Sequence, residues 1–311
     1  MAKALLCKNP ITAPCFRGDE GGFCLPPNGE CIFSLDNVGF CYGYGQSVLE
    51  NISFNVLRGE RLVLLGPNGS GKSTLLKLLS GLLFPTTGKV RAYGESLEAA
   101  AFRDQNFAFS FRRRVGVVLQ NADAQLFCPT VWDEVAFGPL HLGFSPEEVR
   151  KRVSDTLSLV GISGLRGRLP HQLSDGEKKK VALAAVLAVN PEVLLLDEPT
   201  ANLDPRSQHW LLNFLLTLSR VGKTIVVATH DLITVPVLAE KVLILGENHR
   251  LVAAGKPEEI LSDRDLLLAA NLVHPNYHLH RVGSGRDHLY PHVHLSSDNE
   301  VKHNLVGDIG F

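Results

Sequence analysis

The chain has 311 residues, 45% of them hydrophobic and 20% charged, and its 31 basic and 32 acidic side chains give a formal net charge of -1. This is the composition of a soluble globular protein, and a chain of this length can bury a large core. The near-neutral balance excludes the global positive field typical of nucleic-acid binders. The longest apolar run, residues 181–189, is far shorter than the roughly 20 residues that span a membrane. Any membrane role therefore requires a partner chain.

The amino-terminal segment, residues 1–30, is rich in proline, glycine and cysteine and shows little periodicity. We expect it to be a loose extension that precedes the first domain. Lys8, Asn9 and Pro10 interrupt its apolar start, which does not fit a secretory signal. The six cysteines of the chain show no C-x-x-C spacing, so we expect free thiols in a reducing cytosol rather than a zinc or disulfide framework.

Apolar patterning predicts the strands. Residues 32–42 and 47–57 alternate like half-buried strands, and a turn at residues 58–60 leads into a third strand at 61–66. The third strand is apolar almost throughout, as expected where both faces of a sheet are covered. Three later runs share this character: residues 115–120, 193–198 and 224–230. Because helical patterns separate them, the order predicts an α/β fold with a mostly parallel sheet core and an amino-terminal antiparallel β part.

Residues 131–169 differ, because they are helical in pattern and contain no buried-strand run. Ser145 followed by Pro146 and two glutamates is a typical helix start. We therefore expect a helical subdomain, at about residues 125–175, inserted into the sheet domain. One more helix is expected at residues 263–271, after which the chain becomes polar and rich in histidine.

A phosphate-binding loop is predicted between the third strand and a helix expected at residues 73–83. The segment fits the pattern G-x-x-x-x-G-K-[ST] with these residues: Gly66, Pro67, Asn68, Gly69, Ser70, Gly71, Lys72 and Ser73. Glycines let such a loop curl so that backbone N–H groups point at phosphate oxygens, and the helix adds the positive end of its dipole. Lys72 would neutralise the β- and γ-phosphates, and the Ser73 hydroxyl would bind Mg²⁺.

An acidic pair follows the buried strand at residues 193–198, at the edge where open parallel sheets place their ligands. Asp197 is expected to hold the Mg²⁺ shell, and Glu198 to orient and polarise the attacking water. Phosphoryl transfer depends mainly on positioning and charge stabilisation, which two adjacent carboxylates can supply.

Six motifs in register carry a family resemblance. They are GPNGSGKST at 66–74, Gln120, LSDGE at 173–177, VLLLDEPT at 193–200, ANLD at 201–204, and His230. In order and rough spacing they resemble the ATP-binding-cassette (ABC) ATPases over most of the chain. The resemblance implies a P-loop NTPase fold of the ABC type, ATP and Mg²⁺ as cofactors, and ATP hydrolysis. The ABC domain is expected at residues 31–260, followed by a carboxyl-terminal helix and histidine-rich tail at 261–311.

The resemblance also implies roles for single residues. Gln120 is similar to the family's sensing glutamine near Mg²⁺, and His230 would contact the γ-phosphate and the attacking water. Tyr42 resembles the aromatic residue that stacks on adenine, with Tyr44 as the competing candidate; we prefer Tyr42. Thr74, at the end of the first motif, and Asp204, at the end of the fifth, are expected at the nucleotide.

The segment 173–177 departs from the family's common LSGGQ. Ser174 and Glu177 also form a predicted capping box for the helix that follows. In the family this helix start meets the γ-phosphate held by a second subunit, so Ser174 and Gly176 would contact nucleotide across a dimer. Asp175 places a carboxylate near an anion, which Coulomb repulsion disfavours unless the side chain points away. Hydrolysis is then slowed, or the position tolerates the substitution.

The segment after Gln120 is similar to that of energy-coupling-factor importers, including cobalt and nickel uptake systems, in which it lines the groove for a membrane partner. In this chain, Asp123 together with Asp133 or Glu134 would contact basic residues of the partner. The apolar side chains at 126–127 would bury apolar surface against it. The alternative is a solvated surface of the helical subdomain.

The tail carries histidines that suit Ni²⁺, Co²⁺, Zn²⁺ or Cu²⁺, and its ordering is similar to tails of cobalt/nickel importer ATPases. The candidates are His274, His278, His280, His288, His292 and His294; idle, solvated histidines are the alternative. If the tail binds metal, we expect it to buffer or sense the ion.

The predicted function is the ATP-hydrolysing subunit of a membrane ABC importer of the energy-coupling-factor type, a translocase that drives cobalt or nickel uptake. The alternatives are a vitamin importer and a soluble, non-transport ABC ATPase. The expected partners are a second ABC ATPase subunit, either a copy or a paralogue, a transmembrane coupling subunit and a substrate-binding membrane subunit, with no nucleic acid. The expected location is peripheral, on the cytoplasmic face of the membrane.

Overall fold

The computed structural model describes residues 30–43, 45–273, 277–281 and 289–293. The chain divides into two compact units, Met1–Leu272 and Val273–Phe311, and each is described by itself. Most of the expected extension at 1–30 and the alternative adenine residue Tyr44 lie outside the described residues. Among the described helices, none is both long and apolar enough to cross a bilayer.

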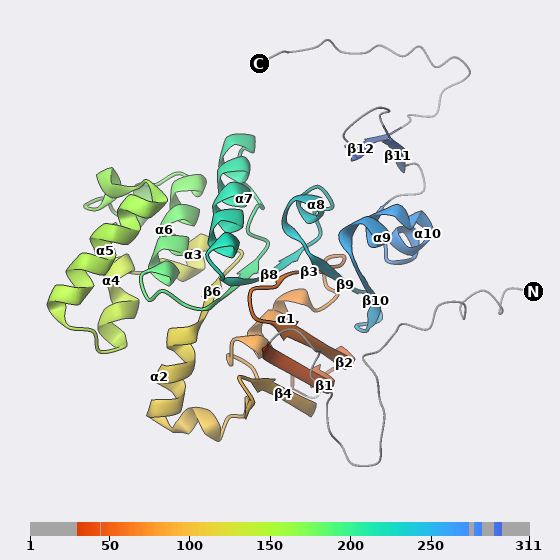
Figure 1. The fold of residues 1–311 in the computed structure, drawn as a ribbon, viewed down its shortest axis with the longest axis horizontal. Helices are drawn as coiled ribbons and strands as arrows, with labels where there is room; N and C mark the ends of the chain where they lie inside the picture. The colour runs from red at the N-terminus through yellow and green to blue at the C-terminus, as the bar shows by residue number, and fades with distance from the viewer. Residues whose placement is uncertain (1–29, 44, 274–276, 282–288, 294–311) are drawn as a thin grey trace, which may run out of the picture. The chain divides into compact units, whose positions relative to one another are not determined.

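A six-stranded sheet forms the centre of the first unit (Figure 1), in the order β10-β9-β3-β8-β7-β6. All neighbours are parallel except β10, which runs antiparallel to β9. The strands are β3 (Arg61–Leu65), β6 (Val115–Val118), β7 (Val193–Asp197), β8 (Thr224–Thr229), β9 (Lys241–Leu245) and β10 (Leu251–Gly255). The four predicted buried strands are confirmed. Sequence patterning had not identified β9 and β10.

An antiparallel sheet of order β2-β1-β4-β5 confirms the amino-terminal β part. Its strands are β1 (Cys31–Cys41), β2 (Ser47–Leu57), β4 (Thr87–Ala92) and β5 (Glu95–Ser96). Helix α1 (Lys72–Leu79) contacts strands of both sheets, and one continuous core joins Phe33 and Leu49, Leu75 and Leu78 of the helix, and Val226. Burial of this core against α1 is what fixes the phosphate loop in place.

Helix α1 is shorter than the predicted 73–83. It ends at Leu79, with Ser80 as its C-cap, and Gly81 follows in the left-handed region at φ 68°. An added Cβ at Gly81 would lie 2.3 Å from the ring of Phe102, so only glycine fits this turn. The apolar run 82–84 misled the prediction because it continues the helical pattern past this stop.

Between β6 and β7 the chain is helical, as the pattern at 131–169 predicted. Ser145 caps α5 by accepting a bond from the Glu148 N–H, as predicted, and Gly161 ends the helix at φ 74°. The segment contains α3 (Ala122–Gln125), α4 (Val131–His141), α5 (Pro146–Val160) and α6 (Asp175–Leu187), with 3₁₀ turns at Ser163–Leu165 and Pro170–Gln172. These elements place α6 against the strand end that carries Gln120.

The remaining helices are α2 (Gln105–Arg114), α7 (Pro205–Arg220), α8 (Thr234–Leu238), α9 (Pro257–Ser262) and α10 (Arg264–Ala269), with a 3₁₀ turn at Ala101–Arg103. Four of these helices contact strands of the central sheet, and α10 packs on α9. The helix predicted at 263–271 is confirmed as α10, and Asp263 caps it by accepting from the Leu266 N–H. The 16-residue α7 lies between β7 and β8, where a helical pattern was expected without stated bounds.

The second unit contains a two-stranded hairpin, β11 (Tyr277–Arg281) and β12 (Leu289–Val293). Its register pairs His278 with His292 and His280 with Tyr290. Sequence patterning predicted no strands in this polar tail. Three further candidate metal ligands, His274, His288 and His294, lie outside the described residues.

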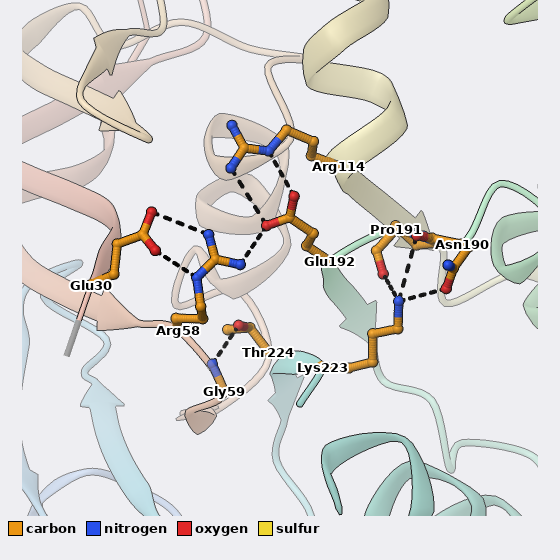
Figure 2. Close-up of polar contacts among 9 residues, drawn as sticks. All are labelled: Glu30, Arg58, Gly59, Arg114, Asn190, Pro191, Glu192, Lys223 and Thr224. Atoms are coloured by element: carbon orange, nitrogen blue, oxygen red, sulfur yellow. Dashed lines mark hydrogen bonds and ion pairs between the residues drawn. The ribbon is translucent and has the colours of Figure 1, made fainter. Parts of the chain in front are cut away.

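An ionic cluster, here called the Glu192 cluster, joins the two sheets at the amino-terminal ends of the parallel strands (Figure 2). Arg58 bonds both Glu30 and Glu192, each at 2.7 Å, and Arg114 bonds Glu192 at 3.0 Å. The Arg114 guanidinium also stacks on the ring of Tyr93, 3.2 Å from its centroid. Two arginines far apart in the sequence therefore converge on the Glu192 carboxylate.

Candidate nucleotide site

The predicted phosphate loop connects β3 to α1, and two of its glycines take conformations that other residues disfavour. Gly69 has φ 83° and Gly71, the N-cap of α1, has φ 107°. A Cβ at Gly71 would lie 2.6 Å from the Val48 carbonyl oxygen, and one at Gly66 would lie 2.4 Å from that of Leu245. The glycines therefore allow the tight curl against β2 and β9 that phosphate-binding loops need.

Lys72 points into this loop and is only 6% exposed. Its Nζ donates to the carbonyl oxygens of Gly66 at 2.7 Å and Pro67 at 3.0 Å, and lies 3.8 Å from Glu198 Oε1. Burial lowers the pKa of Lys72, while the carboxylates of Glu198 and Asp197 work against that shift. A cation held inside a glycine loop at a helix N-terminus is suited to bind phosphate.

Asp197, the last residue of β7, is 8% exposed and its Oδ1 has no hydrogen-bond partner among the described residues. Burial raises the pKa of Asp197, and a hydrogen bond with Ser73 and the charge of Lys72 act in the opposite direction. A hydroxyl and a carboxylate with an unused oxygen are ligands that Mg²⁺ prefers. These residues therefore fit a magnesium ion.

Glu198 follows directly and has the left-handed φ of 41°, which is rare for a residue other than glycine. Its side chain is buried at the end of β7, where Oε1 lies 2.8 Å from His230 Nδ1. The register pairs Leu65 of β3 with Thr229 of β8 and Asp197 of β7 with Ala228, so the carboxyl ends of three neighbouring strands meet here. The structure thus brings Lys72, Glu198 and His230 together.

Tyr42 lies beside the loop. Its hydroxyl is 3.2 Å from Thr74 Oγ1, its ring packs edge-on against Phe40, and the residue as a whole is 49% exposed. An exposed aromatic face at the mouth of a phosphate loop can stack on a base. Ser70 is buried in the loop, and its Oγ has no hydrogen-bond partner among the described residues.

Gln120 follows β6 and is exposed, and its backbone oxygen accepts a bond from Lys179 Nζ at 2.9 Å. Lys179 is 5% exposed, also donates to the Leu119 oxygen at 3.2 Å, and burial lowers its pKa to about 8. The neighbouring Lys178 pairs with Asp123 at 2.8 Å. Sequence reasoning had missed this tie between α6 and the Gln120 segment, because two lysines in a basic run look like a solvated face.

The predicted capping box at α6 is confirmed. Ser174 Oγ accepts from the Glu177 N–H, and the Glu177 carboxylate accepts from the Ser174 N–H. A Cβ at Gly176 would lie 2.9 Å from Ser207 Oγ, so the helix start packs against the beginning of α7, which Asp204 caps. Within this chain Ser174 bonds to its own helix, and it is exposed rather than turned onto the phosphate loop.

Comparison with known proteins identifies the family. Residues 49–201 match the model of the ABC transporter family. A protein of Methanocaldococcus jannaschii described as an energy-coupling factor transporter ATP-binding protein is 42% identical, over 88% of this chain and 97% of the relative. The chain belongs to the ABC transporter ATP-binding proteins. The predicted resemblance to energy-coupling-factor subunits is confirmed, and the chain is an ABC-type ATPase that binds ATP.

Other similar proteins also belong to ABC transporters. A nickel import ATP-binding protein of Rhodobacter capsulatus is 47% identical, over 78% of this chain and 95% of the relative. The structure of cbiO1 from Clostridium perfringens, described as part of the ABC transporter complex cbiONQ, is 34% identical with a TM-score of 0.67 and covers 79% of this chain and 96% of that one. A cassette named MJ0796, described as dimeric with ADP and Pi, is 29% identical with a TM-score of 0.66, over 73% and 99% of the two chains. The predicted P-loop ABC fold is confirmed.

Proposed function

We propose that this ABC ATPase is the ATP-hydrolysing subunit of an energy-coupling-factor importer that drives cobalt or nickel uptake. The observation that carries the proposal is the 47% identity to a nickel import ATP-binding protein over 95% of that relative's length. The 42% identity to an energy-coupling factor ATP-binding protein supports the class of importer. The likeness to cbiO1, a part of the cbiONQ complex, supports assembly with other subunits.

In the proposed site the phosphate loop binds the β- and γ-phosphates through backbone N–H groups and Lys72. Tyr42, hydrogen-bonded to Thr74, stacks on adenine. Ser73, Asp197 and Gln120 hold Mg²⁺, which supplies positive charge that neutralises the phosphate oxygens. The unpartnered Asp197 Oδ1 supports this ligand set, as does the Ser73 side chain, which acts to lower the pKa of Asp197.

Glu198 is the proposed general base for the attacking water, and His230 the residue that contacts the γ-phosphate. The 2.8 Å contact between them supports a shared role, because it places the imidazole where it can orient the carboxylate. Lys72 lies 3.8 Å from the same carboxylate. A phosphate bound by Lys72 would therefore arrive beside the proposed base.

Hydrolysis in this proposal needs two cassettes. Ser174 and Gly176 at the start of α6 are exposed or half-exposed and, with Asp204 of the adjoining loop, would complete the nucleotide site of a second ABC ATPase subunit. That subunit is a copy of this chain or a paralogue. The dimeric MJ0796 cassette with ADP and Pi supports a two-cassette arrangement.

An exposed aromatic surface on the helical segment is the proposed docking site for the transmembrane coupling subunit. Phe127 is 67% exposed, Phe137 45% and Leu140 55%. The rings of Phe127 and Phe137 pack edge-on at 4.9 Å, and Phe137 stacks on His141. A group of exposed apolar side chains of this kind marks an interaction surface.

Two of the residues expected on this surface have internal roles instead. Leu126 is 9% exposed, and Glu134 is 4% exposed and accepts bonds from the N–H groups of Phe127 and Cys128. Asp123 pairs with Lys178, and Asp133 accepts a bond from Thr130. Glu134 therefore shapes the surface by turning Phe127 outward rather than by meeting a partner.

We place this subunit on the cytoplasmic face of the membrane as a peripheral protein, with a substrate-binding membrane subunit in the same complex and no nucleic acid. We divide the chain into the extension at 1–30, the ABC domain at 31–260 with its helical subdomain at about 125–175, and the tail at 261–311. In the tail, the pairing of His278 with His292 supports a site that buffers or senses a transition-metal ion. His274, His280 and His294 complete the proposed ligand set.

Transport decides among the candidate functions. The chain is co-purified with its membrane subunits, reconstituted into vesicles, and tested for ATP-dependent uptake of radiolabelled Ni²⁺, Co²⁺ and a labelled vitamin. Metal uptake that stops with Glu198→Gln supports the proposal. Vitamin uptake without metal uptake would overturn the metal assignment, and absence of any membrane partner would favour a soluble ABC ATPase.

A further inference from the structure

Thr229 is the last residue of β8 and is fully buried, with 0% exposure. Its hydroxyl donates to Glu198 Oε2 at 3.0 Å and accepts from the Asp231 N–H, also at 3.0 Å. The hydroxyl therefore acts as both donor and acceptor, and it links the proposed base to the loop that carries His230. None of the motifs in the sequence pointed to this residue.

This bond makes the two oxygens of the Glu198 carboxylate inequivalent. Oε2 is turned inward to Thr229, while Oε1 faces His230 at 2.8 Å and Lys72 at 3.8 Å. The backbone of Glu198 is in the left-handed region at φ 41°, a conformation that persists only where surrounding contacts enforce it. A buried hydrogen bond to a carboxylate is the kind of contact that can fix such a side chain.

We propose that Thr229 is a positioning residue for ATP hydrolysis, which holds Glu198 Oε2 so that Oε1 faces the attacking water. The proposal rests on the proposed role of Glu198. In the step concerned, the water oxygen bonds to the γ-phosphorus and one water proton moves to Oε1. The bond from the γ-phosphorus to the bridging oxygen breaks, and ADP leaves with that electron pair. Thr229 touches none of the reacting atoms and acts only through the carboxylate.

The test replaces Thr229 by valine, which keeps the branched shape and removes the hydroxyl. We expect kcat for ATP hydrolysis by the full-length chain in its purified complex to fall about ten-fold, the worth of one hydrogen bond to a charged group. KM for ATP should stay within about two-fold, because Thr229 does not contact the nucleotide. Thr229→Ser keeps the hydroxyl and should restore most of kcat.

Thr224 provides a matched control at the opposite end of the same strand. It is also 0% exposed, and its hydroxyl accepts a bond from the Gly59 N–H at 2.8 Å (Figure 2). Thr224→Val therefore removes a comparable buried hydrogen bond far from Glu198 and should lower Tm about as much as Thr229→Val, with kcat unchanged. Equal kcat in the two valine variants would overturn the proposal.

The double variant Thr229→Val in a Glu198→Gln background tests whether Thr229 acts through the Glu198 carboxylate. Once the carboxylate is gone, Thr229→Val should cause no further loss of the residual single-turnover rate. A further ten-fold loss would show that Thr229 acts by another route and would overturn the proposal. Near-normal turnover of Glu198→Gln alone would refute the role of Glu198 itself. An arrested Glu198→Gln beside an unimpaired Thr229→Val would refute only the Thr229 assignment.

Discussion

Glu198 combines a strained backbone with a carboxylate held by Thr229, His230 and Lys72, so its substitution tests the proposed chemistry directly. Glu198→Gln keeps the size and most hydrogen bonds but removes the base. We expect hydrolysis to fall by roughly 100-fold or more, as loss of a general base does, while ATP stays bound and an ATP-loaded dimer accumulates. Phosphate release and gel filtration with ATP measure the two effects. Glu240→Gln is the control, and near-normal turnover of Glu198→Gln would move the catalytic role to another residue.

Asp175 is exposed at the first position of α6, beside the proposed contacts of a second cassette. Its charge stabilises the helix N-terminus, and in the proposed dimer it would repel the γ-phosphate bound by the other cassette. We expect Asp175→Asn, made in the Glu198→Gln background, to tighten the ATP-dependent dimer by about three-fold. Sedimentation at several ATP concentrations checks this. A weaker dimer would mean that the carboxylate points away from the nucleotide and acts only as a helix charge.

At the scale of elements, α6 and the Gln120 segment are joined by Lys179, which donates to the oxygens of Leu119 and Gln120. Lys179→Met fills the same space without the two bonds. We expect the amides of residues 119–125 to exchange hydrogen about ten-fold faster, the effect of losing roughly 1.4 kcal/mol of local stability. Mass spectrometry of the corresponding peptide measures it. Lys180→Met, which loses the contact of the ammonium group with the Trp210 ring, should leave that peptide unchanged; equal exchange in both variants would contradict the role of the Lys179 hydrogen bonds.

The Glu192 cluster makes the free energy of unfolding depend on pH. Burial alone would raise the pKa of Glu192, but hydrogen bonds from Arg114 and Arg58 outweigh it and hold the pKa below the ordinary value of 4.5. A lowered carboxyl pKa contributes stability above the unfolded value, and this contribution is lost as pH falls through the folded value. Because Glu192 is 37% exposed, we expect Glu192→Gln to cost about 1 kcal/mol at pH 7.

Urea unfolding at pH 7 and at pH 3 tests this expectation. The difference between the native chain and Glu192→Gln should be present at pH 7 and shrink as the pH falls toward 3, because acid progressively protonates the native carboxylate. Glu247→Gln, on an exposed loop, is the control. A difference that stays constant with pH would assign the loss to packing rather than to the ion pairs.

For the whole molecule, the division at residue 273 separates the ATPase unit from the histidine-bearing tail. We expect removal of residues 274–311 to abolish binding of Ni²⁺ or Co²⁺ by the chain and to leave ATPase activity within about two-fold, because every proposed nucleotide contact lies before residue 231. Equilibrium dialysis with each metal and a phosphate-release assay measure the two properties. Loss of ATPase activity would assign the tail a structural role, and retained metal binding would place the ligands elsewhere.

The sequence predicted those parts of the molecule whose signals are local. The continuous apolar runs at 61–66, 193–198 and 224–230 revealed the buried strands, and the glycine pattern revealed the phosphate loop. Strand β9 (Lys241–Leu245) was not predicted because its four apolar residues, which follow a short helix, can belong to either a helix or a strand. Thr229 and Lys179 escaped for another reason. A threonine in a strand and a lysine in a basic run are ordinary locally, and their importance arises only when distant segments meet.

Lys72 donates to the carbonyl oxygens of Gly66 and Pro67, which belong to the same loop that is proposed to bind phosphate. These two carbonyl oxygens compete with phosphate for the Lys72 ammonium group. A triphosphate that binds must replace the two hydrogen bonds, because the ammonium group is not free. Such an exchange weakens the affinity of the loop for ATP. It also reduces the conformational entropy that the Lys72 side chain loses on binding, because the side chain is already held in place. We also expect ADP to dissociate faster, because the carbonyl oxygens of Gly66 and Pro67 can bind the Lys72 ammonium group again as ADP leaves.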